Sequence, residues 1–331
     1  MNDQAPRLLL LTRERPGLRS ALQALLPGVT SAFLGETDPT SRPAVEAALL
    51  GSIGRDAVGW EPSAFPRLRF VQRLFAGVDD LPFDRIPAGV QIAGNVGGYS
   101  PFVAEHAVAL ALSSARYVRE GHAAVAEGRA RPAPDLRSLH GETAVILGYG
   151  SIGAALADRL RPFGARIVGV NRRGTAAAGC DVMFSADRLR EAVGAGRFLF
   201  DARPLTVRTR GSIGASELRA MAEDTTFVNV GRGATVDEEA LYRHLVDHPR
   251  FRAALDVWWD EDLAHGRIES RFPFASLPNF LGSPHWAGFS PHVEEYALGT
   301  ALENLARFFR GEPPRHVVDR TEYVGRGAGR P

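Results

Sequence analysis

Residues 143–173 constrain the fold more than any other part of the chain. They read TAVILGYGSIGAALADRLRPFGARIVGVNRR. The apolar run 144–147 predicts a buried strand, and 167–170 predicts a second one. Between them, residues 154–160 carry apolar side chains at helical spacing. A strand, a glycine turn, a helix and a strand in this order are typical of a dinucleotide-binding unit, whereas the turn alone would be weak evidence.

The turn contains three glycines in GxGxxG spacing. The first allows a tight turn, the second lets the backbone approach a pyrophosphate, and the third lets helix and strand pack closely. The N-terminus of the helix also offers unpaired N–H groups and a positive dipole end to phosphates. We therefore predict cofactor contacts at Gly148, Tyr149, Gly150, Ser151, Ile152 and Gly153.

The end of the second strand indicates which dinucleotide binds. An NAD site usually has Asp or Glu there, to bind the 2′-hydroxyl of the ribose. This chain has Asn171, Arg172 and Arg173 instead. No carboxylate is present to repel a 2′-phosphate and two guanidinium groups can pair with one, so the pattern favours NADP(H) over NAD(H). The alternative interpretation is a pair of solvated surface arginines.

Composition excludes several classes of protein. With 331 residues, 45% hydrophobic and 23% charged, the chain has room for two globular domains. Its net charge of +1 gives no reason to expect a nucleic-acid or membrane partner. The four-leucine block near the start is too short for a signal peptide and predicts a strand. The single cysteine, Cys180, excludes an internal disulfide, fits a reducing cytoplasm and is interpreted as structural.

The chain contains no lysine, so all 39 basic residues are arginines. This absence excludes a Walker A lysine, a Schiff-base lysine and a lysine general base.

Strands and helices alternate in the rest of the sequence. Before residue 100 we expect strands at 7–12, 29–34, 57–60, 68–75 and 90–93, and helices at 18–26 and 44–50. This pattern predicts a smaller parallel α/β unit without a phosphate loop. Beyond it, we expect helices at 102–119, 189–193, 215–221, 237–246 and 290–309, strands at 197–202, 225–230, 252–257 and 280–282, and a disordered tail at 325–331. The helix at 102–119, which follows Ser100-Pro101, is apolar on several faces and so predicts burial on more than one side.

Three residues near the ends of the late strands could carry chemistry: Arg232, Glu261 and His285. Ligands of open α/β sheets bind outside the carboxyl ends of the strands. An arginine can grip a substrate carboxylate and polarise a ketone, a histidine can donate a proton, and a carboxylate can orient that histidine. Each residue alone would be weak evidence. Together, beside a nucleotide fold, they are the set needed to reduce a 2-oxo acid.

The sequence resembles the D-isomer-specific 2-hydroxyacid dehydrogenases, which include glyoxylate/hydroxypyruvate reductases and phosphoglycerate dehydrogenase-like proteins. The resemblance extends from about residue 69 to 309 and is weak in the first sixty residues. It rests on the ordered segments FAGVDDLP, SPFVAEHAVALAL, LHGETAVILGYGSIGAALA, RPLTVRTRGSIGASELRAM, FVNVGRGATVDEEAL, ALDVWWDED and LPNFLGSPHWAG.

The resemblance implies roles for particular residues. Arg232 matches the family's carboxylate-binding arginine, Glu261 its glutamate and His285 its catalytic histidine. Ala76 and Gly77 match the loop whose backbone amides contact the substrate carboxylate. Further cofactor contacts are predicted at Pro204, Thr209, Val230, Gly231 and Asp256.

The resemblance also implies an architecture. We expect an α/β protein with a doubly wound Rossmann-type cofactor domain, residues 100–290, inserted in a smaller flavodoxin-like substrate domain, residues 1–99 and 291–331. We expect a cytoplasmic homodimer formed through the cofactor domain. The expected partner is a small 2-oxo or 2-hydroxy acid, and no metal is expected.

Departures from the family pattern leave the substrate open. Asp262 stands where the family has proline, Trp258-Trp259 replaces a commoner Phe plus a polar residue, and Trp286 follows the histidine. Segment 263–274 is an unusual version of its loop. The alternatives are a catalytically quiet dinucleotide-sensing interaction protein, the same fold acting on another anion, and a Rossmann-type methyltransferase, whose cofactor features do not match. His244 and His248 have a spacing that can bind metal, but a solvated helix face is the favoured interpretation.

Overall fold

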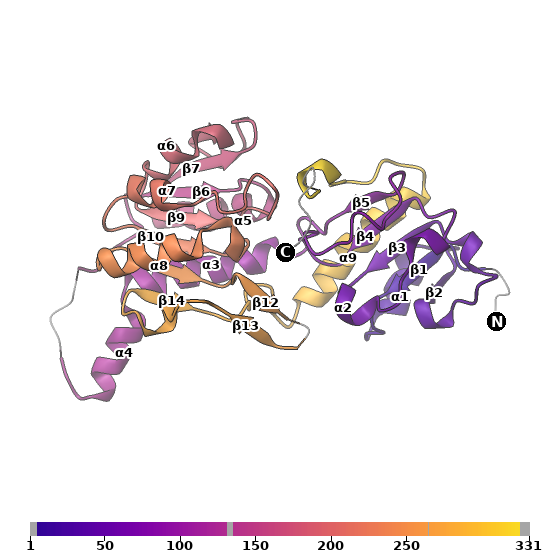
Figure 1. The fold of residues 1–331 in the computed structure, drawn as a ribbon, viewed down its shortest axis with the longest axis horizontal. Coiled ribbons are helices and arrows are strands. Elements are labelled where there is room, and N and C mark those ends of the chain that lie inside the picture. Colours follow the sequence, from indigo (N-terminus) through magenta and orange to yellow (C-terminus); the bar gives the residue numbers. More distant parts are fainter. Residues whose placement is uncertain (1–4, 131–134, 264, 325–331) are drawn as a thin grey trace. The chain divides into compact units, whose positions relative to one another are not determined.

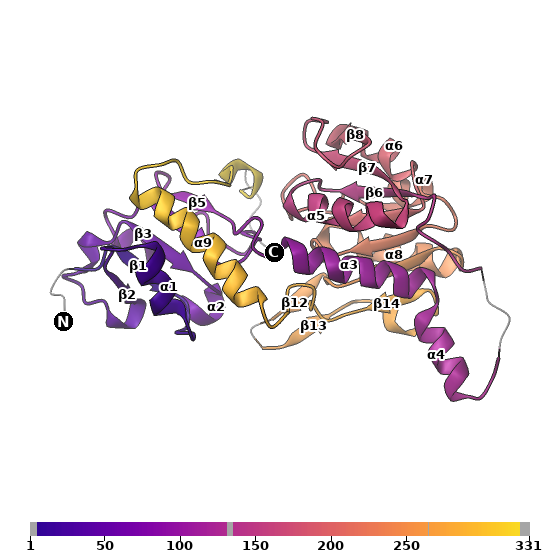
Figure 2. The same cartoon turned by 180° about the vertical axis from the view of Figure 1, so that it is seen from behind.

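The computed structural model describes residues 5–130, 135–263 and 265–324. The predicted tail at 325–331 lies outside these residues. The chain forms two compact units, Met1–Tyr99 with Ser290–Pro331, and Ser100–Phe289. Each unit is built around its own parallel sheet (Figures 1 and 2).

The first unit has a five-stranded parallel sheet in the order β2-β1-β3-β4-β5. This is the flavodoxin-like order 2-1-3-4-5. Its strands are β1 (Leu8–Leu11), β2 (Ser31–Phe33), β3 (Ala47–Leu50), β4 (Phe70–Arg73) and β5 (Gln91–Ala93), and its helices are α1 (Leu18–Leu25), α2 (Ile53–Asp56) and α9 (Val293–Phe309).

The leucines of β1 show how this sheet is buried on both faces. Leu8 and Leu10 pack in a cluster with residues of α1 and α9, whereas Leu9 and Leu11 pack in a second cluster on the other face. Side chains of a strand alternate between faces, so a continuous apolar run fits a strand covered on both sides. The four-leucine block is therefore a strand, as predicted, and it lies between β2 and β3.

The second unit has a seven-stranded parallel sheet in the order β14-β11-β10-β9-β6-β7-β8. In chain order this is 3-2-1-4-5-6-7, the Rossmann order with one added strand. The strands are β6 (Thr143–Leu147), β7 (Arg166–Asn171), β8 (Val182–Ser185), β9 (Phe198–Asp201), β10 (Thr226–Asn229), β11 (Arg252–Leu255) and β14 (Phe280–Gly282). The strand order reverses between β6 and β9, the place where such sheets bind their ligands.

Helices cover both faces of this sheet. They are α3 (Ser100–Ala115), α5 (Ser151–Leu160), α6 (Leu189–Val193), α7 (Ala215–Ala220) and α8 (Glu238–Asp247). Helix α4 (Val118–Ala126) follows α3, packs against it and has no buried residue. Helices α3 and α5 pack together on one face, and α6, α7 and α8 lie on the other (Figures 1 and 2). The helix α3 contacts α5, β10, β11 and β14, which explains why it is apolar on several faces.

Four predictions of secondary structure were wrong. Residues 44–50 were expected to be helical, but β3 lies there, because its four buried residues sit between β1 and β4 and tertiary packing overrides helix propensity. Residues 57–60 form no strand; α2 precedes them, and Gly59 turns the chain with φ 76°. The helix expected over 102–119 is interrupted at Tyr117, where φ is 54°. The helix expected from residue 290 begins only at Val293.

Several elements were not predicted from the sequence: helix α2, most of helix α4, strand β8, and the antiparallel hairpin of β12 (Asp260–Asp262) and β13 (Arg267–Glu269). Within the described residues, no helix combines the length and apolarity needed to cross a bilayer.

Candidate functional site

The glycine loop between β6 and α5 has the geometry that a dinucleotide requires. Gly148 has φ 87°, and a Cβ there would lie 2.9 Å from Cγ of Arg203. A Cβ on Gly153 would lie 2.7 Å from the carbonyl oxygen of Gly148, so only glycine allows this approach of helix to loop. A Cβ on Gly150 would meet nothing within 4 Å. The space beside Gly150 is open, which suits the close approach of a pyrophosphate.

The first turn of α5 completes this loop. No side chain caps the helix at Gly150, so no side-chain cap competes with a phosphate for the N–H groups of its first turn. Gly150 is exposed, and Ser151 and Ile152 are half-buried. The side chain of Tyr149 is turned inward, because its hydroxyl donates to the carbonyl of Ala178 at 2.9 Å. Burial raises the pKa of Tyr149 to about 12.

The end of β7 places the residues that were predicted to select the cofactor. Asn171 uses its side chain within the loop: Oδ1 accepts from the N–H groups of Arg173 and Thr175, both at 3.1 Å, and Nδ2 donates to the carbonyl of Thr175. Arg172 and Arg173 are exposed on this loop. Asn171 thus shapes the turn that carries the two arginines.

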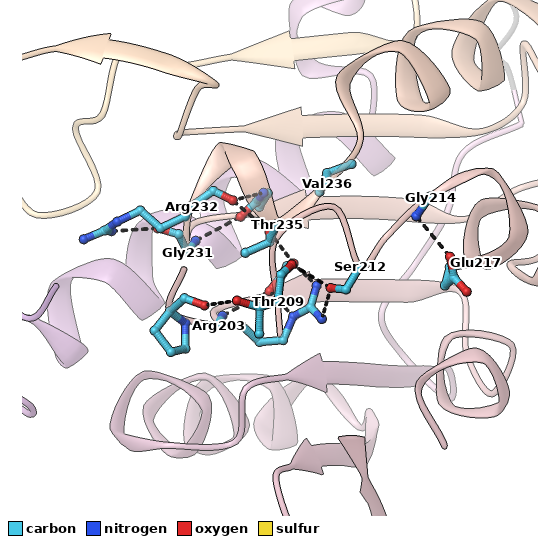
Figure 3. Close-up of polar contacts among 12 residues, drawn as sticks. Arg203, Thr209, Ser212, Gly214, Glu217, Gly231, Arg232, Thr235 and Val236 are labelled. Atoms are coloured by element: carbon cyan, nitrogen blue, oxygen red, sulfur yellow. Dashed lines mark hydrogen bonds and ion pairs between the residues drawn. The ribbon is translucent and has the colours of Figure 1, made fainter. Parts of the chain in front are cut away.

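The loop after β10 holds Arg232. The Asn229 side chain accepts from Gly231 N–H at 3.0 Å and donates to the Arg232 carbonyl at 3.0 Å. The Thr235 N–H donates to that carbonyl as well, at 3.2 Å. Figure 3 shows the guanidinium group of Arg232 extending away from Thr235, with one nitrogen bonded to the Gly231 carbonyl at 2.8 Å. The backbone of this arginine is therefore fixed, and its side chain is half-buried.

The structure brings Glu261 and His285 together. Nδ1 of His285 lies 3.1 and 3.0 Å from the two carboxylate oxygens of Glu261. Their side chains are 25% and 15% exposed, with His285 the more exposed, so the pair is accessible but partly shielded from water. A carboxylate at Nδ1 accepts the N–H of that nitrogen and fixes the ring orientation, so Nε2 is the nitrogen that can give or take a proton.

Trp258 links the three segments that carry Arg232, Glu261 and His285. Its N–H donates to Oε1 of Glu261 at 2.8 Å, and its indole Nε1 donates to the carbonyl of Ser283 at 3.0 Å. A Cβ on Gly233 would clash with the Trp258 backbone, so the loop after Arg232 packs directly against it. Trp258, a departure from the family pattern, is thus a framework residue of the site.

Two of the other departures, Trp259 and Asp262, make contacts of their own. Trp259 stacks on Phe274 and donates to the carbonyl of Val236 at 2.7 Å. Asp262 is paired with Arg267 in the hairpin and contacts His265 at 2.8 Å. The Trp286 side chain is 60% exposed.

The loop of His285 is held by Asp256, which sequence reasoning assigned to the cofactor. Asp256 is fully buried at the end of β11. Its two carboxylate oxygens accept the N–H groups of Trp286 and Ala287, both at 2.8 Å, and its carbonyl accepts the N–H of His285. His285 has φ 58°, a backbone conformation that is rare outside glycine. The hydrogen bonds of Asp256 hold the loop in this conformation.

Two side chains that sequence reasoning missed support Asp256. The hydroxyl of Ser283 donates to Oδ1 at 2.6 Å, and Nε2 of His106 lies 3.0 Å from that hydroxyl and 3.3 Å from Oδ1. Burial raises the pKa of Asp256, but its hydrogen bonds outweigh burial and leave the pKa below the ordinary 3.8. No local pattern marks these two side chains, because His106 and Ser283 are 177 residues apart and meet only in the folded chain.

The remaining predicted residues are placed as follows. Pro204 is exposed, Thr209 is half-buried, and Val230 and Gly231 are buried on the loops after β9 and β10. The Thr209 hydroxyl donates to the Pro204 carbonyl at 2.7 Å. Their cofactor contacts stay a prediction, as does that of Asp256.

Ala76 and Gly77 belong to the first unit. Their loop is held by Arg73, another residue that sequence reasoning missed. Arg73 is buried at the end of β4, donates to the carbonyl of Gly77 at 3.4 Å and pairs with Asp80 at 2.6 Å. The substrate contact predicted for the Ala76 and Gly77 amides stays a prediction.

The solvated-face interpretation was wrong for His244. This side chain is buried, stacked on His248 at 4.1 Å and edge-on to Phe251. Burial, and then the neighbouring His248, lower the pKa of His244 to about 4. Cys180 is half-buried, and its thiol donates to the carbonyl of Val182 at 2.9 Å.

Comparisons with known proteins agree with the fold described above. The profile of the "D-isomer specific 2-hydroxyacid dehydrogenase, NAD binding domain" family matches residues 108–287. The chain is 37% identical over 275 residues to an "Uncharacterized protein in mprR 3'region" of Streptomyces coelicolor, which covers 82% of this chain and 94% of that protein. It is 32% identical to a glyoxylate reductase of Aeropyrum pernix, over 78% of each chain.

A solved structure gives the same result for the fold. The D-isomer specific 2-hydroxyacid dehydrogenase from Xanthobacter autotrophicus, in complex with NADPH and MES, is 28% identical. It superposes with a TM-score of 0.79 over 97% of this chain and 100% of that chain.

Proposed function

Because the chain belongs to the D-isomer-specific 2-hydroxyacid dehydrogenase family, we propose that it reduces a small 2-oxo acid to the D-2-hydroxy acid, with NADPH preferred to NADH. It is an NAD(P)-dependent oxidoreductase. The observation that carries the proposal is the contact of His285 with Glu261 at 3.0 Å, in the same unit as the open glycine loop.

The residues of the chain have distinct tasks in this reaction. When bound, the reduced nicotinamide supplies a hydride to C2 of the substrate. His285 gives the proton on Nε2 to the carbonyl oxygen, and Glu261 holds the ring in position through Nδ1. Arg232 binds the substrate carboxylate and polarises the ketone. The product is the 2-hydroxy acid, and His285 takes a proton from solvent for the next turnover.

The preference for NADPH is supported by the end of β7. Arg172 and Arg173 are exposed there, and the side chain that precedes them is an amide engaged in its own turn. A related structure holds NADPH. Arginine can pair with the 2′-phosphate bidentately, and an amide, unlike a carboxylate, does not repel that phosphate.

The test of this proposal is a binding and turnover screen with the purified protein. NADPH and NADH are titrated by fluorescence, and absorbance loss is followed with glyoxylate, hydroxypyruvate, pyruvate and bulkier 2-oxo acids. We expect turnover with at least one acid, faster with NADPH. Tight NADPH binding without turnover across the panel would contradict the proposal and favour a dinucleotide-sensing protein of the same fold.

Two variants separate the roles. Arg232→Ala should lower kcat/KM about 100-fold while the Kd for NADPH changes less than about threefold. Arg172→Ala with Arg173→Ala should raise the Kd for NADPH about tenfold and leave that for NADH unchanged. The control is Arg243→Ala, an exposed arginine on α8. Equal losses for both cofactors would contradict the role of the arginine pair.

We also infer a homodimer formed through the second unit. Val118 and Val125 of α4 are 56% and 76% exposed, so this helix offers apolar surface to another copy. Light scattering measures the molar mass of the wild-type protein and of the double variant Val118→Glu with Val125→Glu. We expect a dimer for the wild type and a monomer for the variant. A monomer in both would contradict it.

A further inference from the structure

A buried ion pair lies beside the catalytic loops without belonging to them. Asp201 ends β9 and is fully buried, and Arg203, two residues later, is 8% exposed. Nε of Arg203 donates to Oδ1 of Asp201 at 2.9 Å, and a terminal nitrogen donates to Oδ2 at 2.6 Å. The other terminal nitrogen donates to the Ser212 hydroxyl at 2.9 Å (Figure 3). Every arm of this guanidinium is therefore used inside the protein.

The ion pair reaches the Arg232 loop through Thr235. The Thr235 hydroxyl lies 2.9 Å from Oδ2 of Asp201 and 2.8 Å from the carbonyl oxygen of Arg232, and it donates its single proton to one of them. Figure 3 shows Thr235 between Arg232 and the Arg203–Ser212 contact. The Asp201 carboxylate and the Arg232 backbone thus share one hydroxyl.

Backbone packing makes a second link. A Cβ on Gly231 would lie 2.5 Å from the carbonyl oxygen of Arg203 and 2.9 Å from its nitrogen, so the two loops are in direct contact. A Cβ on Gly148 would lie 2.9 Å from Cγ of Arg203. The residue Arg203 therefore packs between the glycine loop on one side and the loop of Arg232 on the other.

A buried ion pair is a poor stabiliser, because desolvation of both charges offsets most of their attraction. Such a pair does supply geometric specificity, because a bidentate contact forms only when the two side chains lie in one relative orientation. We propose that the Asp201–Arg203 ion pair is a positioning device that holds the loop of Arg232 at a fixed place relative to the glycine loop. It rests on the proposed function of Arg232 as the group that binds the substrate carboxylate.

The double variant Asp201→Asn with Arg203→Leu tests this role. It removes both charges, so that neither is left buried alone, and leucine keeps the Cγ that packs on Gly148. We expect a Kd for NADPH within about threefold of wild type. KM for the 2-oxo acid and the Kd of oxamate in the presence of NADPH should each rise about tenfold, with kcat changed much less. Arg203→Lys, which keeps the charge but not the bidentate contact, should fall between.

A second variant and a control keep the test decisive if the double variant fails to fold. Thr235→Val keeps the ion pair and removes only the shared hydroxyl, and it should also raise KM and the Kd of oxamate. The control is Arg137→Leu with Asp224→Asn, an ion pair of 2.5 Å with both side chains 14% exposed. It should alter thermal stability but neither KM nor oxamate binding.

The outcomes separate the two proposals. Unchanged KM and oxamate affinity in a folded double variant and in Thr235→Val would overturn the positioning role alone. Absence of turnover in the wild-type protein would count against the proposed function, and oxamate titration would still decide the positioning role. Absence of oxamate binding to the wild-type protein would overturn both.

Discussion

In the second unit, the two halves of the sheet form their parts of the candidate site by different means. We call the half with β6 and β7 the backbone end, and the half with β9, β10 and β11 the side-chain end. Beside β6 and β7, the glycine loop works through backbone: open space at Gly150, an uncapped helix start, and a turn shaped by Asn171. Beside β9, β10 and β11, the site works through side chains held by buried polar groups, Asp201, Asn229 and Asp256. A backbone site can be written in a short local motif. A side-chain site needs supports that come from distant parts of the chain.

His285→Asn gives the largest expected effect and tests the side-chain end. Loss of the proton donor should lower kcat about 1000-fold, because general acid catalysis contributes factors of this order. The Kd for NADPH should stay within about threefold, because the backbone end is untouched. The measurement is steady-state kinetics with fluorescence titration. His140→Asn, at an exposed histidine of the same unit, is the control. A kcat within about tenfold of wild type would remove His285 from the mechanism.

Gly150→Val tests the backbone end. A Cβ there meets nothing within 4 Å, so the protein should keep its melting temperature, while the Kd for NADPH should rise about 10- to 100-fold. Gly153→Val, where a Cβ would lie 2.7 Å from a carbonyl oxygen, should lose stability as well. If Gly150→Val bound NADPH normally, the pyrophosphate would not lie against this loop.

Asp256→Asn tests whether the side-chain end depends on its buried polar groups. The change alters a residue that holds the loop of His285 and leaves His285, Glu261 and Arg232 in place. Its amide can accept only one of the two N–H groups of Trp286 and Ala287, so the loop of His285 should loosen. We expect kcat to fall about tenfold with a changed pH profile. Ser283→Ala should cause a smaller loss in the same direction. An unchanged kcat and pH profile in both variants would show that the loop needs no such support.

His244 gives the smallest expected effect and measures charge burial away from both ends. Its pKa is about 4 in the fold and 6.5 when exposed, so below pH 6.5 the unfolded state binds more protons. Stability should therefore fall as pH drops from 6.5 towards 4, by on the order of 1 kcal/mol at about pH 5. His244→Phe should reduce the loss of melting temperature between about pH 7 and pH 5 by about 2–4 °C. An identical loss in both proteins would assign the acid sensitivity to other groups.

The sequence by itself determined the local parts of this protein. The order of strands and helices around residues 143–173, the open glycine position and the identities of Arg232, Glu261 and His285 all follow from patterns within short windows. Apolar periodicity and glycine spacing act over a few residues, so they can be seen without a fold. Local patterns also misled in one place: residues 44–50 were predicted to be helical but contain strand β3. Alanine and leucine suit a helix or a buried strand until the neighbouring strands are known.

Only the tertiary structure decided how the site is held. The contact of Glu261 with His285 spans 24 residues, and the contact of His106 with Ser283 spans 177. Arg203 and Asp201 are near in sequence, but what they support, through Thr235 and Gly231, comes from another strand. Such contacts depend on which strands lie side by side, and strand order leaves no periodic trace in a single sequence. The sequence therefore predicted the residues proposed to react, and only the fold showed which contacts hold them in place.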